Sequence, residues 1–280
     1  MIRKTTKVIS TSLLALGLIV TPVLSEDFAS AATKVNKDTK GTIKFDKSTT
    51  PTPEPITPDP TETDPVVPSP DNPPVSSDGL WILAISNWDF GTQSVSALSS
   101  GALNIHAEDD TLSTYTDTNG NGQQDLPGEA SVSKKVTPYA QISDLRGTNT
   151  GWTLSVTASE FKDSSTPAKK IQGAQLTIPK STVATVNSTA KAPTGYDNIT
   201  IPMTGLSTVP VMAAKDKQTA TPTNFSDDEG MGTWTDSFGS AAKNATQTTK
   251  PKLSIPQNTV IEDGTYQSKL TWTLSDTPAI

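Results

Sequence analysis

The same four residues, Trp-Thr-Leu-Ser, occur twice in this chain, at 152–155 and at 272–275. The chain has only five tryptophans, so the repeat needs a physical reason. An indole ring offers a large apolar face with a hydrogen-bond donor at its edge, and exposed indoles would serve as platforms for carbohydrate. Alternatively, each Trp-Thr-Leu-Ser word, as we name the repeated sequence, is one β-strand. The first strand would bury Trp152 and Leu154, the second would bury Trp272 and Leu274, and Thr and Ser would face water.

The alternation of residue types favours the buried alternative. Val156 continues the apolar face of the first word, and Leu270 begins that of the second. An exposed apolar stripe of this kind would be energetically unfavourable and would promote non-specific association. We therefore predict two strands, which can be neighbours, whose Trp and Leu side chains pack as cross-strand partners. Loops and polar faces would then make the contacts with a ligand.

A second candidate site is a loop that resembles a calcium-binding loop. Residues 117–125 place oxygen-bearing side chains at positions one, three, five and nine, and a glycine at position six. Position twelve is Gly128, and Glu129 comes one residue too late. A hairpin loop rich in Gly and Asn accounts for the same residues, and we favour this alternative. We predict no metal site here and no tight calcium binding by Asp117 or Asp125.

Catalytic chemistry has few candidates in this sequence. There is no cysteine and one histidine, His106, which alone cannot build a zinc site and has no Gly-x-Ser-x-Gly elbow beside it. Paired carboxylates can hydrolyse glycosides. Nothing in the sequence distinguishes Glu108, Asp109 and Asp110 from ordinary acidic residues of a loop. The acidic run 227–229 is expected to be a solvated loop tip. The sequence predicts a protein that is not an enzyme and uses no cofactor.

Residues 1–31 are typical of a secretory signal peptide. Residues 1–7 carry three positive charges, an apolar run follows at 12–20, and Ala29-Ser30-Ala31 offers a cleavage site. The apolar run has about half of the roughly 20 residues that a membrane span needs. The chain has a formal net charge of −7 and no Lys/Arg cluster, which argues against a nucleic-acid partner.

Residues 32–74 are predicted to be a disordered linker. Prolines recur with acids and without Lys or Arg between 49 and 74. Proline removes backbone donors and favours the polyproline II conformation, which acts as a semi-rigid spacer. A ligand motif for a proline-binding partner is the alternative, and we favour the spacer.

Residues 75–280 are expected to form one all-β domain, either a β-sandwich or a partly closed barrel. Short runs with period-2 alternation recur there, and Gly, Pro, Asn and Asp separate them. Because cysteine is absent, stability must come from the core and not from disulfides. Besides the two strands of the repeated word, the expected strands are 80–86, 94–98, 103–107, 135–143, 174–179, 182–186 and 252–256.

Three longer stretches of this domain resemble the WxL surface-protein family of Gram-positive bacteria. NWDFGT (87–92) resembles its entry strand, ISDLRGTNTGWTLSV (142–156) its proximal motif and TYQSKLTWTLSDTP (265–278) its distal motif. The resemblance implies a secreted protein held non-covalently at the cell wall through peptidoglycan. Trp152, Leu154, Trp272 and Leu274 would form the wall-binding motif, either directly or by holding the core.

The expected function is therefore attachment to the cell wall without catalysis. The chain stops at WTLSDTPAI, without an LPxTG sorting signal, so retention at the surface is expected to depend on binding. The alternative is a structural or interaction protein that docks onto another exported surface protein and reaches the wall indirectly. Sedimentation with protein-free peptidoglycan separates the two functions.

Overall fold

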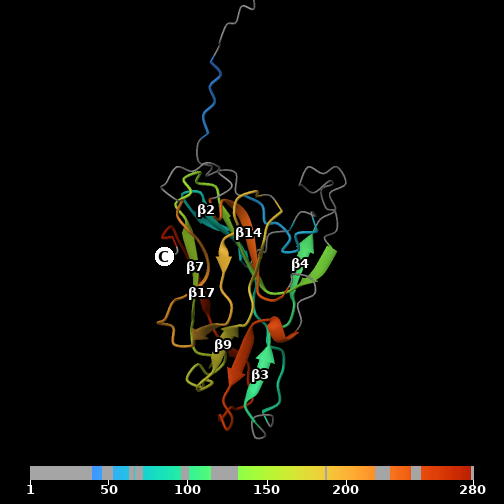
Figure 1. Cartoon of the computed structure of the whole chain (residues 1–280). Helices are drawn as coiled ribbons and strands as arrows, with labels where there is room; N and C mark the ends of the chain where they lie inside the picture. The colour runs from blue at the N-terminus through green and yellow to red at the C-terminus, as the bar shows by residue number, and fades with distance from the viewer. Residues whose placement is uncertain are drawn as a thin grey trace, which may run out of the picture. The chain divides into compact units, whose positions relative to one another are not determined.

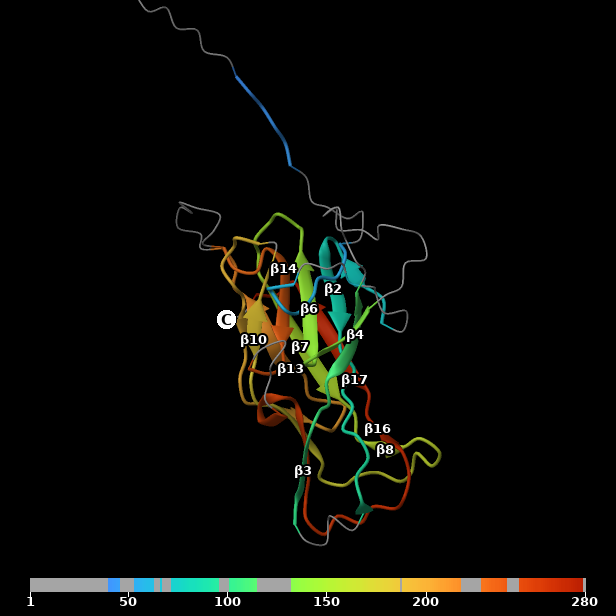
Figure 2. The same cartoon turned by 90° about the vertical axis from the view of Figure 1, so that its right-hand side faces the viewer.

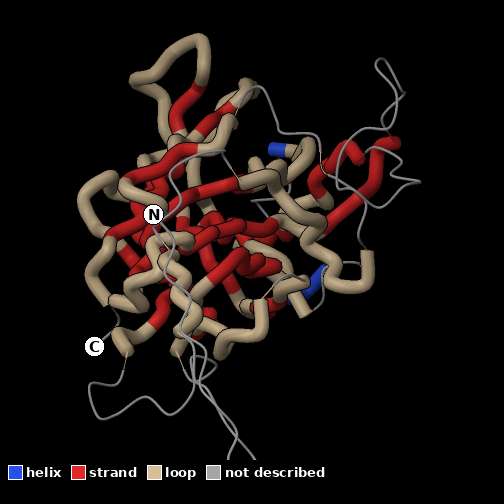
Figure 3. The backbone as a smooth tube through the Cα atoms, turned by 90° about the horizontal axis from the view of Figure 1, so that it is seen from above, coloured by secondary structure: helices blue, strands red, loops and turns tan. Residues whose placement is uncertain are grey.

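The computed structural model describes residues 40–45, 53–62, 66, 72–95, 101–114, 132–186, 188–217, 228–240 and 247–278. Residues 45–280 form one compact unit, and residues 1–44 are assigned to another. The described part of the larger unit is built from β-strands, with 3-10 helical residues at 95 and at Gln247–Thr249 and no α-helix (Figure 3). The predicted signal peptide, 1–31, lies outside the described residues. In the part that is described, no helix has the length and apolar character to cross a membrane.

The predicted all-β class is confirmed, and the described sheets are antiparallel with none closed into a barrel. A five-stranded sheet has the order β1 (Val75–Ser77), β2 (Leu80–Ile85), β6 (Tyr139–Asp144), β14 (Gly232–Ser237) and β10 (Thr182–Ala184). The sheet that carries both Trp-Thr-Leu-Ser words, here named the motif sheet, has the order β11 (Thr194–Gly195), β13 (Val209–Ala214), β7 (Trp152–Ala158) and β17 (Leu270–Ser275).

A third sheet, the lower sheet, occupies the lower end of the domain in Figure 1. Its order is β12 (Ile199–Pro202), β9 (Gln175–Ile178), β15 (Lys252–Ile255) and β3 (Leu103–His106). Two short pairs complete the described strands: β8 (Lys162–Asp163) with β16 (Tyr266–Gln267), and β4 (Asp110–Thr114) with β5 (Val132–Val136).

Local sequence explains several of these strands. β1 and β2 are joined by Asp78-Gly79, and both residues have positive φ, 54° and 90°. Asp-Gly is a favoured pair for such two-residue hairpin turns because these residues tolerate the left-handed region. β7 follows the predicted alternation, since its burial changes at every residue from Trp152 to Ala158. Its inward residues are fully buried, as period-2 patterning requires.

One hydrophobic core joins the three larger sheets. Ile142 of β6, Leu154 of β7 and Leu176 of β9 are fully buried members of the same cluster. Figure 2 shows β6 in front of β7 and β13, the view in which the five-stranded sheet overlies the motif sheet. The sandwich therefore positions β7 centrally, with β13 on one side and β17 on the other.

Part of the predicted linker lies on this domain. The side chain of Gln141 on β6 accepts a hydrogen bond from the backbone N of Ile56 and donates one to its backbone O, both at 2.8 Å. The same amide nitrogen donates to Thr235 Oγ1 at 2.8 Å. Val66 is buried and pairs with Thr114 of β4. Residues 53–62 and Val66 thus contact the domain, whose start at Val75 stays a prediction.

Two of the expected strands differ from the observed ones. The expected strand 135–143 is interrupted at Thr137-Pro138, so that β5 and β6 belong to different sheets. Proline cannot donate to a sheet hydrogen bond, which explains the interruption. In the expected strand 94–98, residues 94 and 95 are not β-strand, and 96–98 lie outside the described residues.

Candidate functional site

The two Trp-Thr-Leu-Ser words lie on adjacent antiparallel strands. β7 pairs with β17 so that Leu154 opposes Leu274 and Trp272 opposes Val156. Opposed residues in an antiparallel pair point to the same face of the sheet. The two leucines therefore pack face to face on the inner side, and the hydroxyl residues of both words share the outer side. The alternation predicted two strands and left open whether they are neighbours, and the structure pairs them directly.

The first tryptophan of the pair is a core residue. Trp152 is fully buried, and its Nε1 donates a hydrogen bond to the carbonyl O of Gly230 at 3.2 Å. Gly230 has φ +75°, and a Cβ there would lie 2.9 Å from Trp152 Nε1 and 2.5 Å from Ala214 Cβ. Only glycine fits this close approach. Trp152 therefore reaches no solvent and acts by holding β7 in the sandwich.

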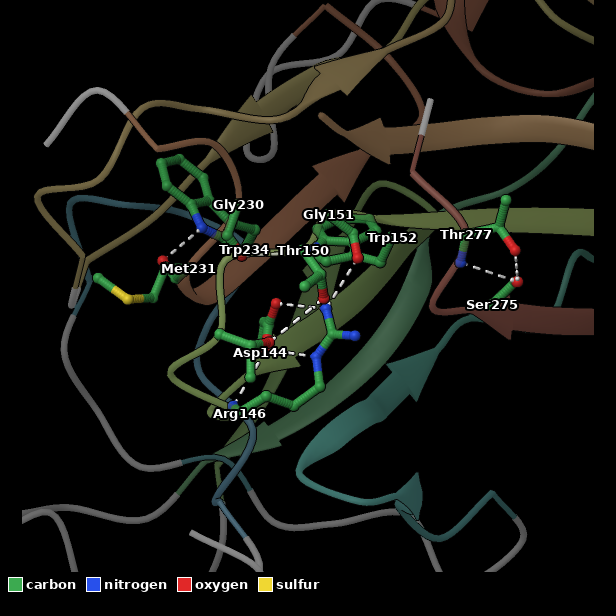
Figure 4. Close-up of polar contacts among 11 residues, drawn as sticks. Asp144, Arg146, Thr150, Gly151, Trp152, Gly230, Met231, Trp234, Ser275 and Thr277 are labelled. Atoms are coloured by element: carbon green, nitrogen blue, oxygen red, sulfur yellow. Dashed lines mark hydrogen bonds and ion pairs between the residues drawn. The ribbon is translucent and has the colours of Figure 1, made fainter. Parts of the chain in front are cut away.

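An ion pair fixes the loop that enters β7 (Figure 4). Arg146 Nη2 lies 2.7 Å from Asp144 Oδ2, and Nε donates to Asp144 Oδ1 at 2.9 Å. The Arg146 Nη2 also donates to the carbonyl O of Gly151 at 2.8 Å. These side chains are buried, and the hydrogen bonds that Arg146 donates to Asp144 raise the pKa of Arg146. The DLRG residues, which resemble part of the family's proximal motif, thus shape the loop before Trp152.

The second tryptophan has a different environment. Trp272 is half-buried and stacks on Phe238, with ring centroids 5.8 Å apart and an interplanar angle of 12°. Trp88 meets both rings edge-on at 80°, with centroid distances of 5.7 Å to Phe238 and 6.1 Å to Trp272. Trp88 belongs to the 87–92 segment, which resembles a family entry strand but forms no β-strand here. These three rings form an aromatic cluster at the edge of the motif sheet.

A groove of about 1620 Å³ runs beside this cluster. Trp88, Phe90, Phe161, Tyr266 and Trp272 contribute its aromatic lining, and Phe90 meets Phe161 edge-on at 6.2 Å. Aliphatic residues from the five-stranded and lower sheets form further parts of the lining, among them Ile82, Ile85, Leu103, Ile105, Leu253 and Ile255. The groove therefore combines a hydrophobic lining with one member of the predicted site, Trp272.

A protein-family model described as "WxL domain surface cell wall-binding" matches residues 32–278. The chain belongs to the WxL domain family. This match confirms the resemblance of the sequence motifs and the expected location at the cell wall and surface. No curated protein and no solved structure matches the chain.

Two adjacent acidic residues of the WxL domain, Asp228 and Glu229, are buried and have partners. Asp228 Oδ2 accepts a hydrogen bond from Asn149 Nδ2 at 2.5 Å. Glu229 Oε1 lies 2.8 Å from Lys191 Nζ, and its Oε2 accepts from the backbone N of Lys215 at 3.1 Å. Both acids are buried, so the predicted solvated loop tip is wrong for these two. Partners distant in sequence determine their burial.

Two of the described residues that were considered for catalysis have separate partners. His106 on β3 opposes Lys252, and burial together with that charge lowers its pKa. Asp109 Oδ1 instead pairs with Lys250 Nζ at 2.6 Å. Among the described residues, no group of three or more His, Cys, Asp or Glu side chains could hold a metal ion. The predicted hairpin loop 117–125 lies outside the described residues.

One buried carboxyl of the WxL domain has an unusual pKa. Burial raises the pKa of Asp236 to about 7, although Ser181 Oγ donates to its Oδ1 at 2.5 Å. Asp236 Oδ2 has no hydrogen-bond partner in the described structure. An unpaired charge in this position would be costly, so Asp236 prefers its protonated form below neutral pH.

Proposed function

We propose that this WxL protein is an exported, non-catalytic surface protein that attaches non-covalently to peptidoglycan of the Gram-positive cell wall. The observation that supports it most is the match to a wall-binding family over residues 32–278, a range that contains both WxL words. The signal peptide pattern at 1–31 supports export. Attachment by binding needs a folded surface, and the described residues of the β-domain supply one.

The four motif residues divide their roles in this proposal. Trp152 and Leu154 are fully buried, so they support binding only by maintaining the fold. Leu274 packs against the same core and opposes Leu154. Trp272 is half-buried and lines the groove, so it is the motif residue that is placed to meet a ligand.

Sedimentation with purified sacculi tests this proposal. The mature protein should pellet with peptidoglycan from which all protein has been removed, and no soluble muropeptides should appear in the supernatant. Protein that pellets only with sacculi that retain their surface proteins would instead support docking onto another exported protein. Release of muropeptides would contradict the non-catalytic assignment.

A further inference from the structure

The groove has a composition that suits one class of ligand. Its lining mixes aromatic and aliphatic side chains with uncharged hydrogen-bonding groups. Asn87, Gln267 and Thr271 are exposed lining residues, and within the described residues their side chains make no hydrogen bond. A ligand with apolar faces and hydroxyl or amide edges could satisfy both parts of this surface.

The charges of the groove argue against an anionic polymer. Five lining residues are acidic and two are lysines. Several of the acids are already engaged: Glu160 Oε1 pairs with Lys170 Nζ at 2.7 Å, and Glu262 pairs with Lys169. Asp163 Oδ1 accepts hydrogen bonds from two backbone N–H groups that follow it. A polyanion would find no excess of positive charge here.

The strand edge beside the groove argues against a peptide that adds to the sheet. Strand addition depends on a run of main-chain hydrogen bonds along an exposed edge. Only residues 270–272 of β17 line the groove, and the carbonyl O of Lys269 already accepts from Ser159 N at 2.9 Å. The edge that faces the groove is therefore short, and its side chains matter more than its backbone.

We propose that this groove binds a linear, uncharged glycan of N-acetylated hexosamines. The sugar rings stack on the aromatic lining around Trp272 and Trp88, the acetyl methyl groups contact the aliphatic lining, and the amides of Asn87 and Gln267 bind hydroxyl and acetamido groups. The assignment rests on the proposed attachment to peptidoglycan and names the glycan as the part that is recognised.

Calorimetry of the mature protein with chitohexaose, an uncharged hexamer of N-acetylglucosamine, tests the ligand class. Chitohexaose should bind, and cellohexaose, which lacks the acetamido groups, should bind at least about tenfold more weakly, a difference of ~1.4 kcal/mol. A Trp272→Phe variant, which retains a ring that can stack on Phe238, should weaken chitohexaose by a similar factor because the larger indole is lost.

A second variant avoids the core altogether. Asn87→Ala combined with Gln267→Ala changes two exposed side chains of the groove, so melting should stay near that of the unmodified protein while chitohexaose weakens at least about tenfold. The matched control is Gln257→Ala, which removes an exposed amide outside the groove lining. This control should leave both melting and binding unchanged.

Parallel sedimentation with sacculi separates this inference from the proposed function. Protein that pellets but binds no chitohexaose, with groove variants that pellet equally well, overturns the groove and leaves wall attachment standing. Binding of a peptidoglycan stem peptide in place of chitohexaose, weakened by the same variants, overturns the choice of glycan. Failure to pellet at all overturns both.

Discussion

Replacing the two motif tryptophans by alanine should affect stability unequally. Trp152 is fully buried and donates to Gly230 O, whereas Trp272 is half-buried at the groove. Removing a buried tryptophan costs about 3–5 kcal/mol of unfolding free energy. In a domain of this size each kcal/mol lowers Tm by about 2–4 °C, so Trp152→Ala should lower Tm by roughly 6–20 °C. Trp272→Ala should lower Tm by about half as much, because less of its surface leaves water on folding.

Thermal and urea unfolding followed by circular dichroism measures both effects. Ser155→Ala is the matched control, because Ser155 lies on the outer face of the same strand and such substitutions stay within about 0.5 kcal/mol. If Trp152→Ala melts within 2 °C of the unmodified protein, the indole does not hold the core. A loss of sacculus binding without a loss of stability in that variant would assign Trp152 a direct role that its burial does not allow.

Two further predictions concern other parts of the domain. Folding raises the pKa of Asp236 to about 7 from its ordinary 3.8, so the folded state binds the extra proton between these values. The free energy of unfolding should therefore fall by about 3 kcal/mol as pH rises from 4 to 7. Asp236→Asn should flatten this slope in urea titrations, and an unchanged slope would exclude Asp236 as its source. Limited proteolysis should leave a resistant core that begins near residue 53. Gln141→Ala, which removes both hydrogen bonds to Ile56, should move the first cleavage toward residue 72. A core that begins near Val75 in both proteins would show that residues 53–62 are not held on the domain.

The strands with clear alternation could be predicted from sequence, and those with polar residues on both faces could not. β7 and β17 were expected because Trp, Leu and Val alternate with Thr and Ser. β14 was not expected, since its sequence, GTWTDS, lacks apolar alternation. In the structure Thr235 is buried on one face and Asp236 on the other. Gln141 forms hydrogen bonds with both Thr235 and Ile56. These partners are distant in sequence, and they allow a polar face of the strand to be buried.

The same limit applies to the candidate site. The repeated word identified Trp152 and Trp272 as a pair, and alternation predicted their shared inner face. The difference in exposure between them depends on Phe238 and Trp88, which lie on other segments. Asp228 and Glu229 were mistaken for a loop tip because their partners Asn149 and Lys191 are distant in sequence. Side-chain type alone does not reveal such pairings.

The pairing of β7 with β17 also bears on the order in which the domain folds. β17 is the last of the described strands, and Trp272 follows Trp152 by 120 residues along the chain. Until β17 emerges, Leu154 and Val156 lack their cross-strand partners, and the inner face of β7 remains incomplete. Contacts between residues so distant in sequence form slowly because the intervening loop must close first. We therefore expect the motif sheet to be completed late in folding, after the chain between the two tryptophans has been made.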